Sequence, residues 1–407
     1  MRRVVITGIG IISSIGNNKK EVLDSLYNGT SGIVFSEEMK KLGIRSKVWG
    51  SIKLESLNII TQKLSRFMNN ASRYSFLAMK EAIKDAKITS TAYQKNPRVG
   101  LISGSGCSFY RDILKNNRHL IKDRCISNTI SPYLAVKTMP SGISACLSTF
   151  FKIYGITYSI SSACATSAHC IGNAFELIQF DKQDLIFAGG GEEVSLELAS
   201  QFDAMRVLST NYNDHPKKAS RVYDVNRDGF VISGGAGILV IEELNSALSR
   251  GANIYAEIVG YAATSDGYSM ISPSGNGAVR CMNLARKNNF VSIDYINVHG
   301  TSTKIGDLIE LKAIKKVFLN EKTPMISATK SMTGHSLGAS GVHEMIYTLL
   351  MLKNNFIAPT INIETLEPFA EDMNIIQRTI NTKIRTAMSN SFGFGGSNAS
   401  LIIKKYE

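Results

Sequence analysis

The sequence has no long hydrophobic run and no cysteine spacing of the kind that holds metal ions. No stretch approaches the ~20 consecutive apolar residues that a membrane-spanning helix needs, so we expect no membrane span. The chain contains no CxxC pair, and in 407 residues six cysteines are too few for a disulfide framework. We therefore expect reduced thiols, no bound metal and a cytoplasmic location. The cysteines are Cys107, Cys125, Cys146, Cys164, Cys170 and Cys281.

Nucleotide-binding signatures are missing as well. The glycine clusters GSGCSF and GGGEEV match neither the dinucleotide fingerprint nor the P-loop. The net charge of +13 and the pI near 9.3 imply attraction to something acidic. Because the lysines and arginines are scattered, an acidic protein partner or a phosphorylated substrate explains the charge at least as well as nucleic acid does. Biased genome composition would explain it without any partner.

What is present is typical of a soluble globular protein, with 44% hydrophobic and 19% charged residues. Short β-branched runs that end in glycine or serine alternate with helical patterns, which predicts an α/β fold with buried strands. The first run, MRRVVITGIG, begins like a signal peptide with two arginines. It lacks an Ala-x-Ala cleavage site, which favours a first strand that leads into a glycine turn.

Two segments share one plan of strand, small polar loop and apolar helix: ITYSISSACATSAHCIGNAFELIQ and TPMISATKSMTGHSLGASGVHEMIYTLLML. In the first, the spacing of apolar residues predicts one buried helix face, and in the second the helix is apolar on most sides. We therefore predict a duplicated α/β unit, joined near residues 250–255, with halves 1–252 and 253–407. The predicted buried positions are Ile171, Ala174, Phe175 and Ile178 in the first helix, and Val342, Met345, Ile346, Leu349 and Leu352 in the second.

Cys164 stands among small residues in YSISSACATSAHC, after a strand and at the start of a predicted helix. The free N–H groups and the dipole of a helix start favour a thiolate. By position alone, a nucleophile and a buried structural thiol both remain open.

Two histidines lie at strand ends beside glycine and hydroxyl residues, His299 in NVHGTST and His335 in SMTGHSLGASG. Open α/β sheets place ligands at the carboxyl ends of their strands, so we expect Cys164, His299 and His335 to converge. The other histidines lack such a setting and are expected to be structural: His119, His169, His215 and His343.

Two further features accompany these residues. Lys330 precedes His335, and Glu344 lies on the next helix, so the pair either fixes charge at a reaction centre or forms an ordinary salt bridge. The segment SNSFGFGGSN, residues 389–398, is too glycine-rich for a plain strand. We expect a loop whose N–H groups form an oxyanion contact or a phosphate cradle, with a tight packing turn as the alternative.

In order and spacing, these motifs resemble those of the β-ketoacyl-[acyl-carrier-protein] synthases of the elongating type. The resemblance runs end to end and is closest to the synthase I subgroup, through MRRVVITGIG, HCIGNA and SNSFGFGGSNASL. It implies a thiolase fold with two similar halves in a duplicated five-layered α-β-α-β-α architecture, usually as a homodimer.

The resemblance also implies a role for each residue. Cys164 resembles the acyl-accepting nucleophile, and His299 and His335 resemble the histidines that serve decarboxylation and condensation. Lys330 resembles the lysine that organises the site, with Glu344 as its partner. The remaining matches are Phe394, whose N–H joins that of Cys164 in an oxyanion hole, Phe392, a gating phenylalanine, and Thr301 and Thr303, whose hydroxyls contact phosphopantetheine.

The reaction that the resemblance implies is the decarboxylative condensation of a malonyl thioester with an acyl group on Cys164, in fatty acid biosynthesis. Both substrates would arrive on the phosphopantetheine arm of acyl carrier protein, so no resident cofactor, metal or nucleic acid is implied. Lys63 and Arg66 in TQKLSRFM resemble carrier-docking residues, although a solvated helix face is the alternative. Cys107 stands where synthase I tends to be glycine-rich, which makes it a candidate for the acyl pocket and leaves chain-length preference open.

Two rivals share this fold. A thiolase or CoA-dependent synthase is the nearer one, but initiating condensing enzymes and chalcone-type synthases use Cys-His-Asn, whereas this chain offers two histidines. A catalytically inactive chain-length factor would lack the nucleophile, and Cys164 is present.

Overall fold

The computed structural model describes residues 1–53, 60–107, 111–113, 131–287 and 292–407, so Cys125 and His119 lie outside the described residues. The strands are β1 Val4–Ile12, β2 Ile33–Phe35, β3 Val48–Gly50, β4 Val99–Gly104, β5 Thr157–Tyr158, β6 Leu185–Glu192, β7 Gly235–Glu243, β8 Ala256–Ser265, β9 Tyr295–Asn297, β10 Met325–Ser327, β11 Phe356–Ile357, β12 Ile380–Asn381, β13 Thr386–Gly393 and β14 Ser397–Lys404. The helices are α1 Lys19–Asn28, α2 Glu37–Lys41, α3 Gln62–Ser65, α4 Asn70–Asp85, α5 Ser90–Tyr93, α7 Leu134–Thr138, α8 Gly142–Phe151, α9 Thr166–Gln179, α10 Leu196–Ala204, α11 Leu244–Ser249, α12 Asn276–Arg286, α13 Lys304–Val317, α14 Lys330–Thr333 and α15 Ser340–Asn354. Short 3₁₀ turns are η2 Pro216–Lys218, η3 Leu337–Ala339, η4 Pro368–Ala370 and η5 Phe394–Gly396.

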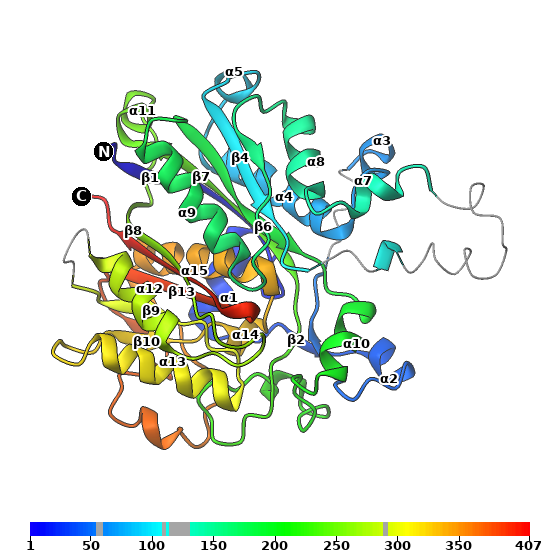
Figure 1. Ribbon diagram of the computed structural model, residues 1–407, viewed down its shortest axis with the longest axis vertical. Helices are drawn as coiled ribbons and strands as arrows, with labels where there is room; N and C mark the ends of the chain where they lie inside the picture. Colours follow the sequence, from blue (N-terminus) through cyan, green and yellow to red (C-terminus); the bar gives the residue numbers. More distant parts are fainter. Residues whose placement is uncertain (54–59, 108–110, 114–130, 288–291) are drawn as a thin grey trace.

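A 10-stranded sheet in the order β10-β9-β13-β14-β8-β1-β7-β6-β4-β5 forms the frame of the molecule (Figure 1). On one side of the central β1–β8 pair the order is β7, β6, β4, β5, and on the other it is β14, β13, β9, β10. In each half the outer pairings are parallel and the inner ones antiparallel. The same arrangement therefore occurs twice, as the two strand–loop–helix segments predict. The chain passes from one half to the other between the end of α11 at Ser249 and the start of β8 at Ala256.

Helices lie in layers on both faces of the two half-sheets (Figure 1). In the middle layer, α9 contacts strands of both halves and packs against α15, which contacts β7 and β13. On the outside, α4 and α8 cover the first half, while α12, with α13 beside it, covers the second. The layer order is thus α-β-α-β-α. Every apolar position predicted to be buried on α9 and α15 is buried, and α15 is enclosed from Ser340 to Leu352.

The first apolar run forms β1, which lies at the centre of the sheet and is buried at every position, as predicted for a strand. Its glycines are required by the close approach of α4. A Cβ at Gly8 would lie 2.6 Å from the carbonyl oxygen of Ala82, and one at Gly10 would lie 1.9 Å from that of Ala78.

The prediction of a loop over residues 389–398 is wrong for most of that segment. Ser389 to Gly393 belong to β13, and β14 begins at Ser397, so only η5 departs from strand geometry. The strand forms because β9 and β14 pair with β13 on its two sides. This pairing outweighs the low strand propensity of its small residues. The turn itself depends on Gly395 and Gly396, which have φ values of 77° and 75°.

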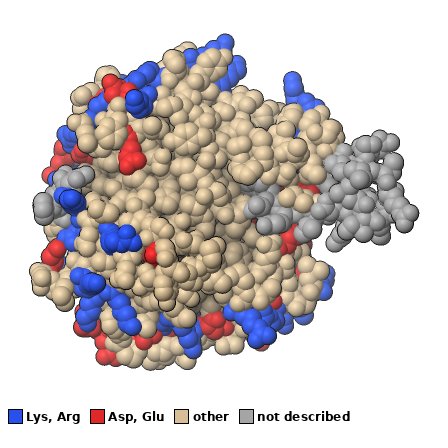
Figure 2. Space-filling view, viewed as in Figure 1, with Lys and Arg blue, Asp and Glu red and all other residues tan. Residues whose placement is uncertain are grey.

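Within the described residues, the cysteines other than Cys125 are free thiols, and no helix is long and apolar enough to cross a membrane. On the face seen in Figure 2, basic side chains lie mainly towards the margin, interspersed with acidic ones. The described residues on this face therefore present no continuous basic stripe of the kind that tracks a nucleic-acid backbone.

Candidate active site

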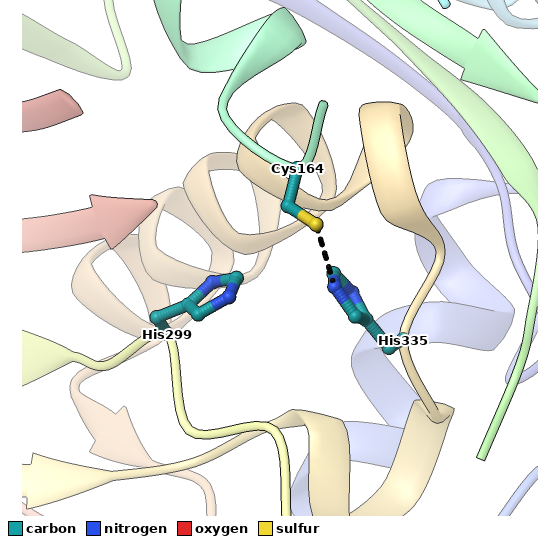
Figure 3. A group of neighbouring side chains, drawn as sticks. All are labelled: Cys164, His299 and His335. Carbon is teal, nitrogen blue, oxygen red and sulfur yellow. Dashed lines mark hydrogen bonds between the residues drawn. The ribbon is translucent and has the colours of Figure 1, made fainter. Parts of the chain in front are cut away.

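Cys164, His299 and His335 come together at the ends of elements from both halves (Figure 3). Cys164 lies just before α9, which begins at Thr166. His335 Nε2 lies 3.0 Å from Cys164 Sγ, and the two imidazole centroids are 5.3 Å apart. The sulfur and one ring nitrogen of each histidine lie within 4.8 Å of one another.

The small residues around Cys164 allow other backbones to approach it. The preceding residue, Ala163, has a φ of 50°, which turns the chain sharply before the helix. A Cβ at Gly393 would lie 3.1 Å from the backbone nitrogen of Cys164, and one at Gly341 would lie 2.7 Å from that of Ala168. The run of small side chains thus lets the β13–η5 turn and α15 pack directly against the cysteine turn.

Hydrogen bonds at Nδ1 determine the tautomers of both histidines. The Leu337 N–H donates to Nδ1 of His335 at 3.3 Å, and the Ser340 hydroxyl lies 2.9 Å from the same atom. The Lys330 ammonium lies 3.5 Å from Nδ1 of His299 and donates to its carbonyl oxygen at 2.6 Å. A backbone N–H and an ammonium cannot accept, so each neutral ring carries its proton on Nε2.

Both imidazoles are neutral. Burial lowers the pKa of His299 well below its ordinary value, and the charge of Lys330 lowers it further. The same two causes lower the pKa of His335. The site therefore presents two Nε2–H donors beside the sulfur, which suits a developing negative charge.

These tautomers make the cluster a poor metal site despite its spacing. A metal ion would need the Nε2 lone pairs of His299 and His335, but protons occupy both. The positive charge of Lys330 lies behind the rings and disfavours a cation further. The chemistry of the cluster is that of an anion hole.

At Cys164, burial acts against the thiolate that a helix start favours. Burial raises its pKa to about 12, although Lys330 and the N–H of Phe394 lower it. Desolvation outweighs the helix dipole because the sulfur is enclosed. The N–H of Phe394 and the Nε2–H of His335 nevertheless point at the sulfur, where they would stabilise charge as it forms.

Lys330 and Glu344 form a buried ion pair, with side chains 3% and 2% exposed. Burial raises the pKa of Glu344 to about 7, while Lys330 opposes that shift. Neither residue lines the cavity, so the pair acts on the site from behind His299.

Acidic residues on α13 hold the loop that carries His299, and the sequence interpretation missed them. Glu310 accepts the N–H groups of His299 and Gly300, both at 2.8 Å. Asp307 accepts those of Thr301 and Ser302, at 3.0 and 3.1 Å. The available signal was Asp307 in the first turn of a helix directly after NVHGTST, with Glu310 three residues further on, where both carboxylates could satisfy free N–H groups of the loop.

A serine–histidine chain behind His335 was also missed. The hydroxyls of Ser340 and Ser336 lie 3.3 Å apart, and Ser336 contacts Nδ1 of His343 at 3.0 Å. His343, expected to be structural, thus connects with the ring of His335 through two hydroxyls.

A cavity of about 480 Å³ opens beside the cysteine and both histidines. Phe392, Phe394, Thr301 and Thr303 line it, and the two threonine hydroxyls are 2.9 Å apart. Cys107 packs against the same apolar cluster as Cys164.

The structure does not bring the predicted docking pair to this cavity. Lys63 lies on the short helix α3, and both it and Arg66 are exposed. The Arg66 guanidinium lies over the rings of Phe67 and Tyr133, at 5.1 and 5.2 Å from their centroids. Arg66 therefore also contributes to local packing.

Comparisons with known proteins agree with this geometry. Residues 1–247 match the family model for the beta-ketoacyl synthase N-terminal domain, and residues 255–364 match that for the C-terminal domain. The chain is 82% identical, over its whole length and that of the relative, to a 3-oxoacyl-[acyl-carrier-protein] synthase 1 of Buchnera aphidicola. Among solved structures, a beta-ketoacyl synthase from Burkholderia phymatum superposes with a TM-score of 0.93 at 32% identity, each chain fully covered. A ketosynthase of a type II polyketide system, solved in complex with its acyl-carrier protein, superposes with a TM-score of 0.89 at 27% identity, again with full coverage of both chains.

Proposed function

Since this chain belongs to the β-ketoacyl synthase family, we infer that it is a 3-oxoacyl-[acyl-carrier-protein] synthase of fatty acid biosynthesis. It condenses an acyl thioester with a malonyl thioester and releases carbon dioxide. The main support for these roles is the pair of neutral Nε2–H donors beside Cys164. Decarboxylation of a malonyl thioester produces an enolate, and its oxygen needs hydrogen-bond donors of this kind.

In the first half-reaction, the sulfur of Cys164 attacks the carbonyl of the acyl thioester. The new C–S bond replaces the bond to the carrier thiol, which leaves with the proton of Cys164. Because burial raises the pKa of this thiol, the N–H of Phe394, the Nε2–H of His335 and the charge of Lys330 are needed to stabilise the forming thiolate.

In the second half-reaction, the malonyl carboxylate leaves as carbon dioxide, and the electrons of the broken C–C bond form an enolate. The Nε2–H groups of His299 and His335 donate to the enolate oxygen. The enolate carbon then attacks the carbonyl of acyl-Cys164, whose oxygen is received by the N–H groups of Cys164 and Phe394. The C–S bond breaks, the thiolate of Cys164 takes up a proton from solvent, and 3-oxoacyl product remains on the second carrier.

The substrates arrive on the phosphopantetheine arm of acyl carrier protein, and no further cofactor takes part. Thr301 and Thr303 contact the arm, since both residues line the cavity and their hydroxyls lie 2.9 Å apart. Phe392, whose ring centroid lies 6.1 Å from that of His299, gates the approach. Cys107 does not line the cavity, but it packs against the apolar cluster that contains Cys164, which supports a place for it at the end of the acyl pocket.

We also propose a cytoplasmic homodimer. Among the described residues, β5 pairs only with β4 and ends the sheet, so a second copy could continue it. Apolar side chains next to this edge are exposed, with Tyr154 at 61% and Tyr158 at 37%. Sedimentation velocity tests the dimer, and a Tyr158→Asp variant should shift the protein to monomer, whereas an exposed Tyr268→Asp variant should not.

The proposed function is tested by mass spectrometry after incubation with acyl-[acyl carrier protein]. A peptide that contains Cys164 should gain one acyl mass, and Cys164→Ser should abolish this product. Acylation at Cys107 or Cys170 instead would refute the assignment, as would an absence of acylation in protein with an intact Cys164.

A further inference from the structure

Glu192 is a buried carboxylate at the end of β6 that the reaction above does not use, and it is 1% exposed. Its Oε1 accepts the hydroxyl of Ser105 at 2.6 Å. Its Oε2 accepts the N–H of Gly106 at 2.9 Å and that of Gly338 at 3.1 Å. These donors belong to two loops, one after β4 and the other just after His335.

The two loops touch at this point without room for a side chain. A Cβ at Gly338 would lie 2.2 Å from the nitrogen of Gly106, and one at Gly106 would lie 2.6 Å from the carbonyl oxygen of Ala163. Gly106 is thus packed between Gly338 and the turn before Cys164. A single carboxylate ties together segments from three places in the sequence.

We propose that Glu192 is a positioning residue, which holds the loop after His335 against the nucleophile turn and sets the charge beside Cys164. Leu337, next to the Gly338 that Glu192 binds, supplies the N–H that donates to Nδ1 of His335. Loss of the carboxylate would therefore loosen the donor that fixes the tautomer of His335.

The charge of Glu192 acts on the thiol directly. Burial raises the pKa of Glu192 to about 7, so it is ionised at the alkaline pH where the thiol titrates. Beyond burial, the charged groups that act on the pKa of the Cys164 thiol are Lys330, which lowers it, and Glu192 and Glu344, which raise it. Removing the negative charge at position 192 should lower this pKa and make the thiolate form at lower pH.

Two substitutions separate the two effects. In Glu192→Gln, the amide oxygen can accept both glycine N–H groups, and the amide NH₂ can donate to the Ser105 oxygen. The Ser105 hydroxyl already lies 3.1 Å from the Cys107 carbonyl, to which it can then donate. The glutamine keeps the clamp and loses the charge, whereas Glu192→Ala loses both.

The measurement is the pH dependence of Cys164 alkylation by iodoacetamide, together with the condensation rate. Both variants should be alkylated about 3–10-fold faster at a fixed pH that lies above the Glu192 pKa of about 7 and below the thiol pKa, since one pKa unit is a tenfold change in thiolate. Condensation should stay within about threefold of the parent in Glu192→Gln and fall about 10²-fold in Glu192→Ala, the cost of a small misplacement of reacting groups. A matched control is Glu243→Gln, another buried glutamate, which should change neither quantity.

The inference rests on the proposed function only for the condensation readout, because alkylation needs no carrier substrate. An unshifted alkylation profile in Glu192→Gln would overturn the charge effect. A Glu192→Ala variant that condenses like the parent would overturn the clamp. Failure of the parent protein to condense at all would instead contradict the proposed function.

Discussion

The two histidines of the site differ in what their Nε2 atoms reach. His335 Nε2 lies 3.0 Å from Cys164 Sγ, whereas the ring of His299 stands beside Phe392 and is held from behind by Lys330. Both can donate to an enolate oxygen, but in the described structure only His335 has a hydrogen bond to the sulfur. Their contributions to the two half-reactions should therefore differ.

This difference predicts distinct kinetics for the alanine variants. His299→Ala should lower malonyl decarboxylation about 10²–10³-fold, as loss of one oxyanion donor does, and leave acylation of Cys164 nearly unchanged. His335→Ala should lower decarboxylation by a similar factor and also slow acylation, because the thiolate loses a donor. Single-turnover measurements of each half-reaction check this, with exposed His215→Ala as the control. Equal effects of the two substitutions on both steps would contradict the division.

Burial of His343 should make the protein less stable in acid. Burial lowers the pKa of His343 to about 4, although the carbonyls of Ala236 and Ile12 oppose the shift. Between pH 6.5 and 4 the unfolded chain then binds a proton that the folded protein does not, so stability falls as the pH falls. Replacing His343 by Gln removes this penalty.

The His343→Gln variant should therefore gain stability relative to the parent as the pH drops from 7 to 4, by at most about 3 kcal/mol. Denaturant unfolding at pH 7, 5.5 and 4 measures this difference. His215→Gln, which removes an exposed ring, is the matched control and should show no such trend. A constant difference between His343→Gln and parent at every pH would show that the ring does not lose its proton on folding.

Single residues were predictable from sequence when their setting was local. Cys164, His299 and His335 each follow a strand within a short motif, and the structure brings them together. Glu192 gave no such signal, because its partners lie 87, 86 and 146 positions away in the chain. Its contacts exist only once separate loops have packed, which no local pattern encodes.

At the scale of elements, the β13–η5–β14 hairpin shows how a local pattern misled. Its glycines predicted a loop, but pairing on both sides of β13 overrides their low strand propensity. The N–H of Phe394, predicted to form an oxyanion contact, is aimed at Cys164 because Gly393 lets the hairpin touch the cysteine turn.

A side chain at position 393 should therefore move the hairpin away from Cys164. A Cβ there would lie 3.0 Å from the Ser162 carbonyl oxygen and 3.1 Å from the Cys164 nitrogen. Gly393→Ala should lower the condensation rate about 10–10²-fold, which does not exceed the decrease caused by complete removal of one oxyanion donor. Steady-state kinetics check this, with Gly142→Ala as the control, since a Cβ at Gly142 meets nothing closer than 3.5 Å. An unchanged condensation rate in Gly393→Ala would contradict this prediction, because it would show that the turn accommodates the added methyl group without moving the Phe394 N–H away from Cys164.

At the scale of the whole molecule, the duplication was predictable because each half repeats a local strand–loop–helix plan. The continuity of the sheet through the β1–β8 pair was not predictable from sequence, because Val4 to Ile6 pair with residues 256–258, far away in the chain. We propose 1–252 and 253–407 as the two halves, since the crossing lies between α11 and β8. The site needs both, with Cys164 from the first half and His299 and His335 from the second.

The net charge of +13 is a property of the whole molecule. Lys63 offers the sharpest test of whether this charge attracts an acidic carrier protein. An acidic carrier would be steered by exposed basic groups, mainly through its rate of association. Lys63 is the cleaner probe than Arg66, which also packs over Phe67 and Tyr133.

Lys63→Glu should raise the apparent KM for carrier-bound substrates about 3–10-fold, the effect of removing roughly 1 kcal/mol of salt-sensitive attraction and adding repulsion. The increase should shrink as salt is added. Turnover of a small pantetheine thioester, which needs no protein docking, should be unaffected. The charge-matched control is Lys322→Glu, at an exposed lysine that does not line the cavity. If Lys322→Glu raises KM as much as Lys63→Glu does, the carrier responds to total charge and not to a docking site at α3. If Lys63→Glu instead lowers activity equally with carrier-bound and pantetheine substrates, this lysine supports the fold and not docking.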